Sequence, residues 1–138
     1  MNRTGGVGRP VTYAGSGVDI AAGEHAVELM RSAVAKTVRP EVVGGIGGFA
    51  GLFDASRIAG LRRPLLATST DGVGTKVVIT RLTGSYATIG IDLVGMVVDD
   101  LVVCGAEPLF MTDYIATGKV VPEIITAIVT GPRTRARG

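Results

Sequence analysis

The segment Ser-Thr-Asp-Gly-Val-Gly-Thr-Lys, residues 69–76, combines residue types that bind phosphate groups. Its glycines permit positive φ angles and let backbone N–H groups approach an anion closely. Lys76 would add a positive point charge, and Asp71 a carboxylate for a divalent cation. The order Gly74-Thr75-Lys76 is not that of a P-loop, in which the lysine precedes the hydroxyl residue. The segment therefore predicts a phosphate site of another kind, with an ordinary turn and a solvated lysine as the open alternative.

A second glycine cluster, Gly-Gly-Ile-Gly-Gly-Phe-Ala-Gly at 44–51, fits the dinucleotide fingerprint G-x-G-x-x-A from Gly45 to Ala50. Only Val42-Val43 precede it, which is too short for the first strand of a Rossmann unit, and no helical pattern follows. We therefore expect a loop here, without regular structure over most of its length.

Three aspartates lie in an apolar segment of helical period, residues 89–104. Asp92 and Asp99 are seven residues apart, which places them within about 20° on one helical face. Asp100 lies about 100° further round. Because the helix is otherwise almost wholly apolar, we expect at least one of these acids to be nearly buried. A buried carboxylate is costly unless it is paired or binds a metal. Capping and lysine-paired aspartates stay open as structural alternatives.

Two further acids belong to predicted strands. Asp113 shares one face of the strand 108–117 with apolar side chains, and Asp71 follows the strand 65–70. Converging carboxylates repel one another by about 1–4 kcal/mol per close pair near a surface, and a divalent cation removes that cost. Mg²⁺ typically joins carboxylates to substrate phosphates. The acids that could form such a site are Asp71, Asp99, Asp100 and Asp113.

The elements that must position these residues alternate between helix and strand. Asp19 is a plausible N-cap of a helix that ends at Arg39-Pro40. Gly105 stops the helix 89–104, and Pro122 starts a last helix that Gly131-Pro132 cuts short. Residues 77–80 fit a strand or a short helix. This alternation indicates a layered α/β or α+β domain.

Composition narrows the class of protein further. The 138 residues suit one domain, and 46% hydrophobic with 19% charged residues excludes disorder of the whole chain. The single cysteine, Cys104, cannot form an internal disulfide, which favours a reducing, cytoplasmic location. We also expect the Cys104 side chain to be buried. No signal peptide and no run of 18 apolar residues is present, so no membrane partner is expected.

The net charge of +2 depends on the C-terminal arginines. Removing Arg133, Arg135 and Arg137 turns it into −1, so the charge does not favour a nucleic-acid partner.

Five segments in order resemble one family. The sequence over about residues 13–131 is similar to the N-terminal half of phosphoribosylformylglycinamidine cyclo-ligases, also called aminoimidazole ribonucleotide synthetases. The segments that carry the likeness are GSGVDIAAG (15–23), RPEVVGGIGGFAGLF (39–53), TDGVGTK (70–76), TIGIDLVGMVVDDLVVCGAEPLF (88–110) and DYIATGK (113–119).

The resemblance implies an ATP- and Mg²⁺-dependent ligase of purine biosynthesis. Such an enzyme closes the ring of formylglycinamidine ribonucleotide to give aminoimidazole ribonucleotide. The implied fold is α+β, a mixed sheet with helices on one face, whose sheets pair in a homodimer. Siblings in the superfamily include small-molecule kinases, and a sibling kinase is one alternative function.

Carried onto this sequence, the resemblance assigns roles to individual residues. Asp71 with the turn at Gly72 and Gly74 would face phosphates and metal, and Lys76 would neutralise charge during phosphoryl transfer. Asp100 is the expected metal ligand, Asp99 stands where the family usually has Asn, and Asp113 is a candidate for metal or substrate contact. The implied nucleotide or substrate contacts are Gly44, Gly45, Gly47, Gly48, Asp71, Gly72, Gly74, Thr75 and Lys76, of which Lys76 and Asp71 are the catalytic candidates.

The likeness stops at the last helix. We expect a flexible arm over 1–17, an ATP- and Mg²⁺-binding domain over 18–131, and a basic tail over 132–138 that resembles a truncation, with the family's second domain absent. A fragment of this kind could also be a non-catalytic dimerising piece, which is the second alternative.

Overall fold

The computed structural model describes residues 11–46, 48 and 50–134, with side chains as far as Gly131. It is an α+β chain, in agreement with the expected class. A short 3-10 helix, η1 (Ala14–Ser16), is followed by α1 (Ile20–Ala35) and a hairpin of β1 (Val42–Val43) and β2 (Leu52–Phe53). The remaining elements are α2 (Ser56–Ala59), α3 (Lys76–Thr83), α4 (Ile89–Val103) and α5 (Pro122–Thr134).

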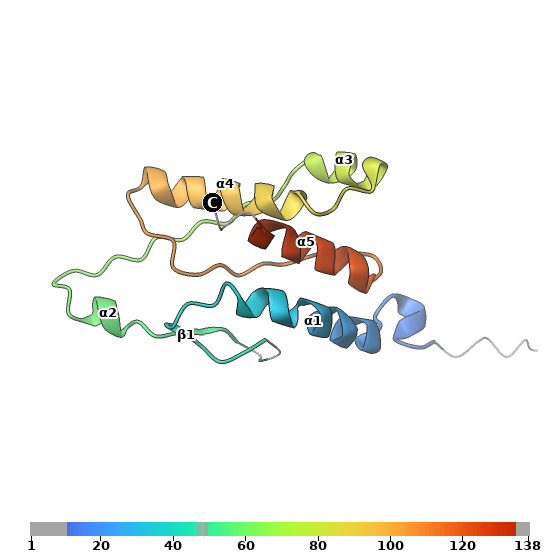
Figure 1. The fold of residues 1–138 in the computed structure, drawn as a ribbon, viewed down its shortest axis with the longest axis horizontal. Helices are drawn as coiled ribbons and strands as arrows, with labels where there is room; N and C mark the ends of the chain where they lie inside the picture. The colour runs from blue at the N-terminus through green and yellow to red at the C-terminus, as the bar shows by residue number, and fades with distance from the viewer. Residues whose placement is uncertain (1–10, 47, 49, 135–138) are drawn as a thin grey trace, which may run out of the picture.

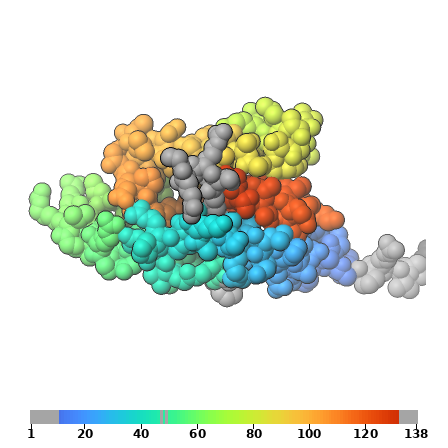
Figure 2. Space-filling model, viewed as in Figure 1, coloured from blue at the N-terminus to red at the C-terminus, as the bar shows by residue number. Residues whose placement is uncertain are grey.

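Three long helices form one layer. Helix α5 lies between α1 and α4 and packs on both, while α3, which precedes α4 in the chain, lies beside the N-terminal end of α4 (Figure 1). The space-filling view has the same order, with α5 filling the space between α1 and the pair α3–α4 (Figure 2). The buried side chains of the described residues come from three of these helices: Ala26, Thr80, Ile89 and Val97.

Glycine permits the closest of these helix contacts. Gly131 of α5 is buried, and a Cβ atom built on it would overlap the backbone carbonyl of Ala87, just before α4. Only a residue without a side chain allows this approach. The contact fixes the C-terminal turn of α5 against the start of α4.

Local signals set the helix ends as expected. The Asp19 carboxylate accepts a hydrogen bond from the Ala22 amide at 3.0 Å and caps α1. Gly105, with φ 71°, follows α4, and the amides of Gly105 and Ala106 donate to the carbonyls of Val102 and Leu101, a Schellman motif. Pro122 is the first residue of α5.

Two predicted helix ends and the predicted burial of Cys104 are wrong. Helix α1 ends at Ala35, before Arg39-Pro40. Helix α5 is not cut short at Gly131-Pro132 but continues to Thr134; the φ of proline is compatible with a helix, although its missing N–H removes one helical hydrogen bond. Cys104 is exposed, not buried, because it lies at the C-cap of α4, where the chain turns away.

The predicted strands at 65–70 and 108–117 are absent. Within the described residues the sheet has two strands, antiparallel, with Val42 opposite Phe53 and Val43 opposite Leu52. Residues 64–73 and 106–117 run as irregular chain beside α4 and α5 (Figure 1). A strand needs a neighbour for its N–H and C=O groups, and the described chain offers these two segments none. Residues 77–80, for which strand and helix were both open, are helical.

The ends of the chain are described only in part. Of the expected arm over 1–17, residues 1–10 lie outside the described residues and Ala14–Ser16 form η1. In the part of the chain that the structure describes, no helix has the length and apolar character needed to cross a membrane.

Candidate functional site

The candidate phosphate-binding segment, residues 69–76, contacts helix α4 through its first and its last residue. The Ser69 hydroxyl donates to Oδ2 of Asp100 at 2.7 Å, and Nζ of Lys76 lies 3.4 Å from Oδ2 of Asp92. Asp92 is in the first turn of α4 and Asp100 near its C-terminal end. Eight helical residues span about 12 Å, so the glycine turn lies along the helix between two fixed points.

Lys76 is the first residue of α3 and reaches across to α4. Besides Asp92, its Nζ meets the Sδ atom of Met96 at 3.7 Å. The side chains of Lys76 and Asp92 are each 45% exposed, so solvent screens the ion pair and leaves the ammonium accessible to a ligand. Asp92 is thus a lysine-paired aspartate, one of the structural alternatives to a metal ligand.

The turn between the two contacts is short and glycine-dependent. Gly74 has φ 58°, a left-handed conformation, and the Gly72 amide donates to the Asp71 carboxylate at 2.6 Å. Thr75 is the N-cap of α3 but makes no side-chain cap bond. The amides of Val77 and Val78 in the first turn of α3 donate to the carbonyls of Gly74 and Thr75, so Lys76 is the group at this helix start that can attract a phosphate.

The predicted acids are more exposed than expected. Asp92, Asp99 and Asp100 are all exposed, so the expectation of a nearly buried carboxylate on α4 is wrong. Among the described helices, α3 and α5 pack on α4 and leave part of its surface open, and even Val102 and Val103 face solvent. Asp71 and Asp113 are exposed as well.

A closed metal cage is not formed by the residues that the structure describes. They contain no group of three or more His, Cys, Asp or Glu side chains able to hold a metal ion. The structure brings Asp100 to Ser69, and it does not join Asp71, Asp99 and Asp113 to them as one cluster. Mg²⁺ nevertheless needs only one or two carboxylates when substrate phosphates supply its other ligands. The oxygen donors along α4 fit that open arrangement, and the assignment of individual metal ligands stays a prediction.

The glycine cluster 44–51 connects β1 to β2. Gly44 has φ 94°, and Gly45 and Gly48 are exposed, whereas Gly47 and Phe49 lie outside the described residues. The loop is irregular, as expected, and its role in binding stays a prediction.

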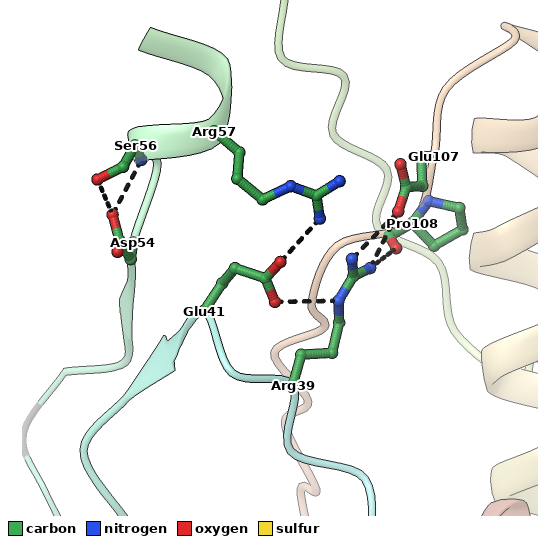
Figure 3. A network of polar contacts seen from close by, with 7 residues as sticks. All are labelled: Arg39, Glu41, Asp54, Ser56, Arg57, Glu107 and Pro108. Carbon is green, nitrogen blue, oxygen red and sulfur yellow. Dashed lines mark hydrogen bonds and ion pairs between the residues drawn. The ribbon is translucent and has the colours of Figure 1, made fainter.

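An ion-pair network fixes the base of this hairpin (Figure 3). Glu41, which precedes β1, accepts a hydrogen bond from Arg57 of α2 at 2.8 Å and faces Nε of Arg39 at 3.5 Å. The Glu41 side chain is only 15% exposed. The hydrogen bond from Arg57, a backbone hydrogen bond and the charge of Arg39 hold the pKa of Glu41 below its usual value.

The same network reaches the chain that follows α4. Both terminal nitrogens of Arg39 donate to Glu107, at 3.2 and 3.1 Å, and one also donates to the carbonyl of Pro108 at 3.1 Å (Figure 3). Next to it, the rings of Phe53 and Phe110 stack with centroids 5.1 Å apart. The hairpin is thereby attached to the chain just beyond the helix that carries Asp92 and Asp100.

A comparison with protein families decides the relationship of the chain. Residues 54–137 match the family described as "AIR synthase related protein, N-terminal domain". The chain belongs to this family.

Three curated relatives of this AIR synthase related domain carry the name phosphoribosylformylglycinamidine cyclo-ligase. The protein of Geobacillus kaustophilus is 60% identical over 119 residues, and that of Thermosynechococcus vestitus 53% over 119 residues. That of Leptospira interrogans serovar Lai is 49% identical over 121 residues. The matches cover 86–88% of this chain but only 34–35% of the relatives, so the chain spans about a third of their length.

Sequence reasoning missed several polar contacts of this AIR synthase related domain. It did not connect Ser69 with Asp100, or Arg39 with Glu107, which are 31 and 68 residues apart. The charged residues Arg39 and Glu41, just before Val42-Val43, are the local signal that an ion-pair network flanks the short strand. Nothing in the local pattern indicates which partner each charge takes.

Proposed function

We propose that this chain forms the ATP- and Mg²⁺-binding N-terminal part of a phosphoribosylformylglycinamidine cyclo-ligase. The complete reaction converts formylglycinamidine ribonucleotide and ATP into aminoimidazole ribonucleotide, ADP and phosphate. The observation that carries the proposal is the glycine turn of residues 69–76, held along α4 between Lys76 and Asp100. The family and the names of the relatives support the reaction class.

In the proposed site each residue has a limited task. Lys76 binds the nucleotide phosphates, and the turn at Gly72 and Gly74 lets the backbone approach them. Asp100, with Asp71 as second candidate, supplies oxygen to Mg²⁺, which when bound neutralises charge on the phosphates. Asp99 and Asp113 are peripheral candidates for metal or substrate contact.

The hairpin loop is the proposed substrate-side element. Gly44, Gly45, Gly47 and Gly48 would give the ribonucleotide phosphate access to backbone amides. The network of Arg39, Glu41, Arg57 and Glu107 supports this role, because it fixes the base of the loop relative to the end of α4.

The mixed sheet implied by the resemblance is proposed to form between two copies. Residues 64–70 and 108–116 have no strand partner in the described chain, and Leu65, Leu66, Phe110 and Tyr114 are exposed on them. Segments with unpaired backbone N–H and C=O groups are templates for pairing with another chain. The same exposure favours the second candidate function, a dimerising piece without catalysis.

An activity test separates the two candidates. The chain is mixed with Mg-ATP and formylglycinamidine ribonucleotide, with and without a separately produced remainder of the Geobacillus kaustophilus protein. We expect aminoimidazole ribonucleotide only in the complemented mixture, and none with Lys76→Ala. The Glu24→Gln variant, altered on an exposed site of α1, is the control. No product in either mixture, together with no Mg-ATP binding by calorimetry, would leave only the dimerising role.

A further inference from the structure

Ser69 has a contact that the proposed nucleotide site does not yet use. Its hydroxyl donates to Oδ2 of Asp100 at 2.7 Å, a normal length for a bond to a carboxylate. Ser69 lies in irregular chain and Asp100 on a helix, so the bond joins two elements 31 residues apart. Ser69 is only partly exposed, whereas Asp100 is exposed.

An exposed aspartate on a helix samples several side-chain rotamers, and a metal ligand must occupy one. A hydrogen bond from a second element removes part of that freedom. It also leaves the carboxylate able to bind a cation, because two carboxylate oxygens offer about four lone-pair sites and one hydroxyl occupies only one. Outer partners of this kind orient the ligating groups of metal sites.

We propose that Ser69 is a positioning residue that holds the Asp100 carboxylate where a nucleotide-bound Mg²⁺ meets helix α4. The inference rests on the proposed function, since it needs Asp100 to face the metal. It adds the residue immediately before the glycine turn to the site. Ser69 acts through Asp100 and contacts neither ATP nor the metal itself.

A positioning role for Ser69 and a purely structural role predict different changes in ATP affinity. If Ser69 acts through the ligand of the metal, its loss lowers only the part of the ATP affinity that Mg²⁺ adds. If the bond merely fixed residues 64–73 to α4, its loss would disturb Lys76 and the turn as well. The affinity for ATP without metal would then fall equally.

The test is calorimetric titration of the full 138-residue chain with ATP, in Mg²⁺ and in a chelator. Ser69→Val and Ser69→Thr form a matched pair, because both are β-branched and similar in shape and only Thr keeps the hydroxyl. We expect Ser69→Val to reduce the Mg²⁺-dependent gain in affinity about tenfold, the lower end for outer partners of metal ligands. We expect Ser69→Thr to restore it and the affinity in chelator to stay unchanged in both.

Two controls make the result specific. Ser32→Ala changes an exposed serine on α1 and should bind Mg-ATP like the unmodified chain. In an Asp100→Asn background, Ser69→Val should cause no further loss, because the residue through which it acts is already altered.

The possible failures are distinct. An unmodified chain that binds no Mg-ATP overturns the proposed function and the role of Ser69 with it. An unmodified chain that binds Mg-ATP, with Ser69→Val binding equally well, overturns the positioning role alone. A loss of affinity that is the same in chelator and in Mg²⁺ also overturns it, and assigns Ser69 a structural task.

Discussion

At the scale of single residues, Lys76 lies between two competing partners. Its ammonium lies 3.4 Å from Oδ2 of Asp92, while the proposed function directs the same charge to phosphate. Both side chains are about half exposed, so the pair costs little to exchange. Asp92 therefore holds the Lys76 ammonium beside the first turn of α4 in a pair that a phosphate can replace.

Replacing Asp92 by Asn should change stability only slightly. Exposed ion pairs contribute about 0–1 kcal/mol, and salt screens them. We expect the free energy of unfolding, from urea titration, to fall by no more than about 1 kcal/mol at low salt and less at high salt. Glu24→Gln on α1 serves as the charge-matched control. A larger loss that persists at high salt would mean that the pair is effectively buried.

A glycine pair tests the packing of α5 on α4. Gly131→Ala should lower the free energy of unfolding by about 1–3 kcal/mol, because the new methyl group would overlap the Ala87 backbone. Gly95→Ala in α4 is the opposite case, because a Cβ there meets nothing within 4 Å. It should stabilise the chain by about 0.5–1 kcal/mol through helix propensity. Equal effects of the two changes would contradict the close approach of α5.

At the scale of elements, the hairpin depends on one carboxylate. Glu41 joins Arg57 of α2 to Arg39, and Arg39 continues to Glu107 beyond α4. Asp54, after β2, accepts hydrogen bonds from the hydroxyl and the amide of Ser56, and these lower its pKa. An acid with a lowered pKa therefore lies at each end of the hairpin, and Glu41 is the one that joins it to other elements.

Acid should loosen this hairpin. The folded-state pKa of Glu41 is lowered, chiefly by the hydrogen bond from Arg57, so the unfolded chain binds its proton first. The stabilisation is complete above the unfolded value, about 4.3 for Glu, and is lost as the pH falls through the lower folded value. Urea midpoints measured across this range should decline less steeply in Glu41→Gln than in the unmodified chain.

Asp54→Asn provides a comparison for the acid effect. Hydrogen bonds from Ser56, and no arginine, lower the pKa of the Asp54 carboxylate. The Asp54→Asn substitution should therefore remove a separate part of the loss of stability in acid. If Glu41→Gln and the unmodified chain lose stability in parallel as the pH falls, the network does not hold the hairpin in solution.

At the scale of the whole molecule, the described chain buries few large apolar side chains. Its buried hydrophobic residues are Ala26, Ile89 and Val97, while Leu65, Leu66 and Tyr114 are 76–90% exposed. Exposed apolar segments of this extent mark interaction surfaces. Residues 64–70 and 108–116 combine that exposure with unpaired backbone, which is why we propose that they pair with a second copy.

Charged substitutions on these segments should block that pairing. We expect the unmodified chain to sediment as a dimer whose fraction rises with concentration, and Leu66→Lys and Tyr114→Lys to sediment as monomers. Leu82→Lys alters a side chain of similar exposure on α3, outside both segments, and should leave the dimer intact. A chain that is monomeric at all concentrations would refute the pairing.

The sequence by itself determined those features whose cause is local. Asp19, Gly105 and Pro122 mark helix ends because a cap, a positive φ or a missing N–H acts within one turn of the chain. The motifs likewise indicated the family that the comparison then established. The roles of the single site residues stay predictions.

Tertiary structure alone decided the exposure of the acids, the fate of the strands and the partners of the charges. Asp92 and Asp100 are exposed although residues 69–76 contact them, because within the described chain no helix or strand packs over these two side chains, which no helical period can reveal. Residues 65–70 and 108–117 have strand-like patterns but no neighbour in the described chain. Burial, strand pairing and the contact of Ser69 with Asp100 all depend on which distant segments meet, and a local pattern carries no information about that.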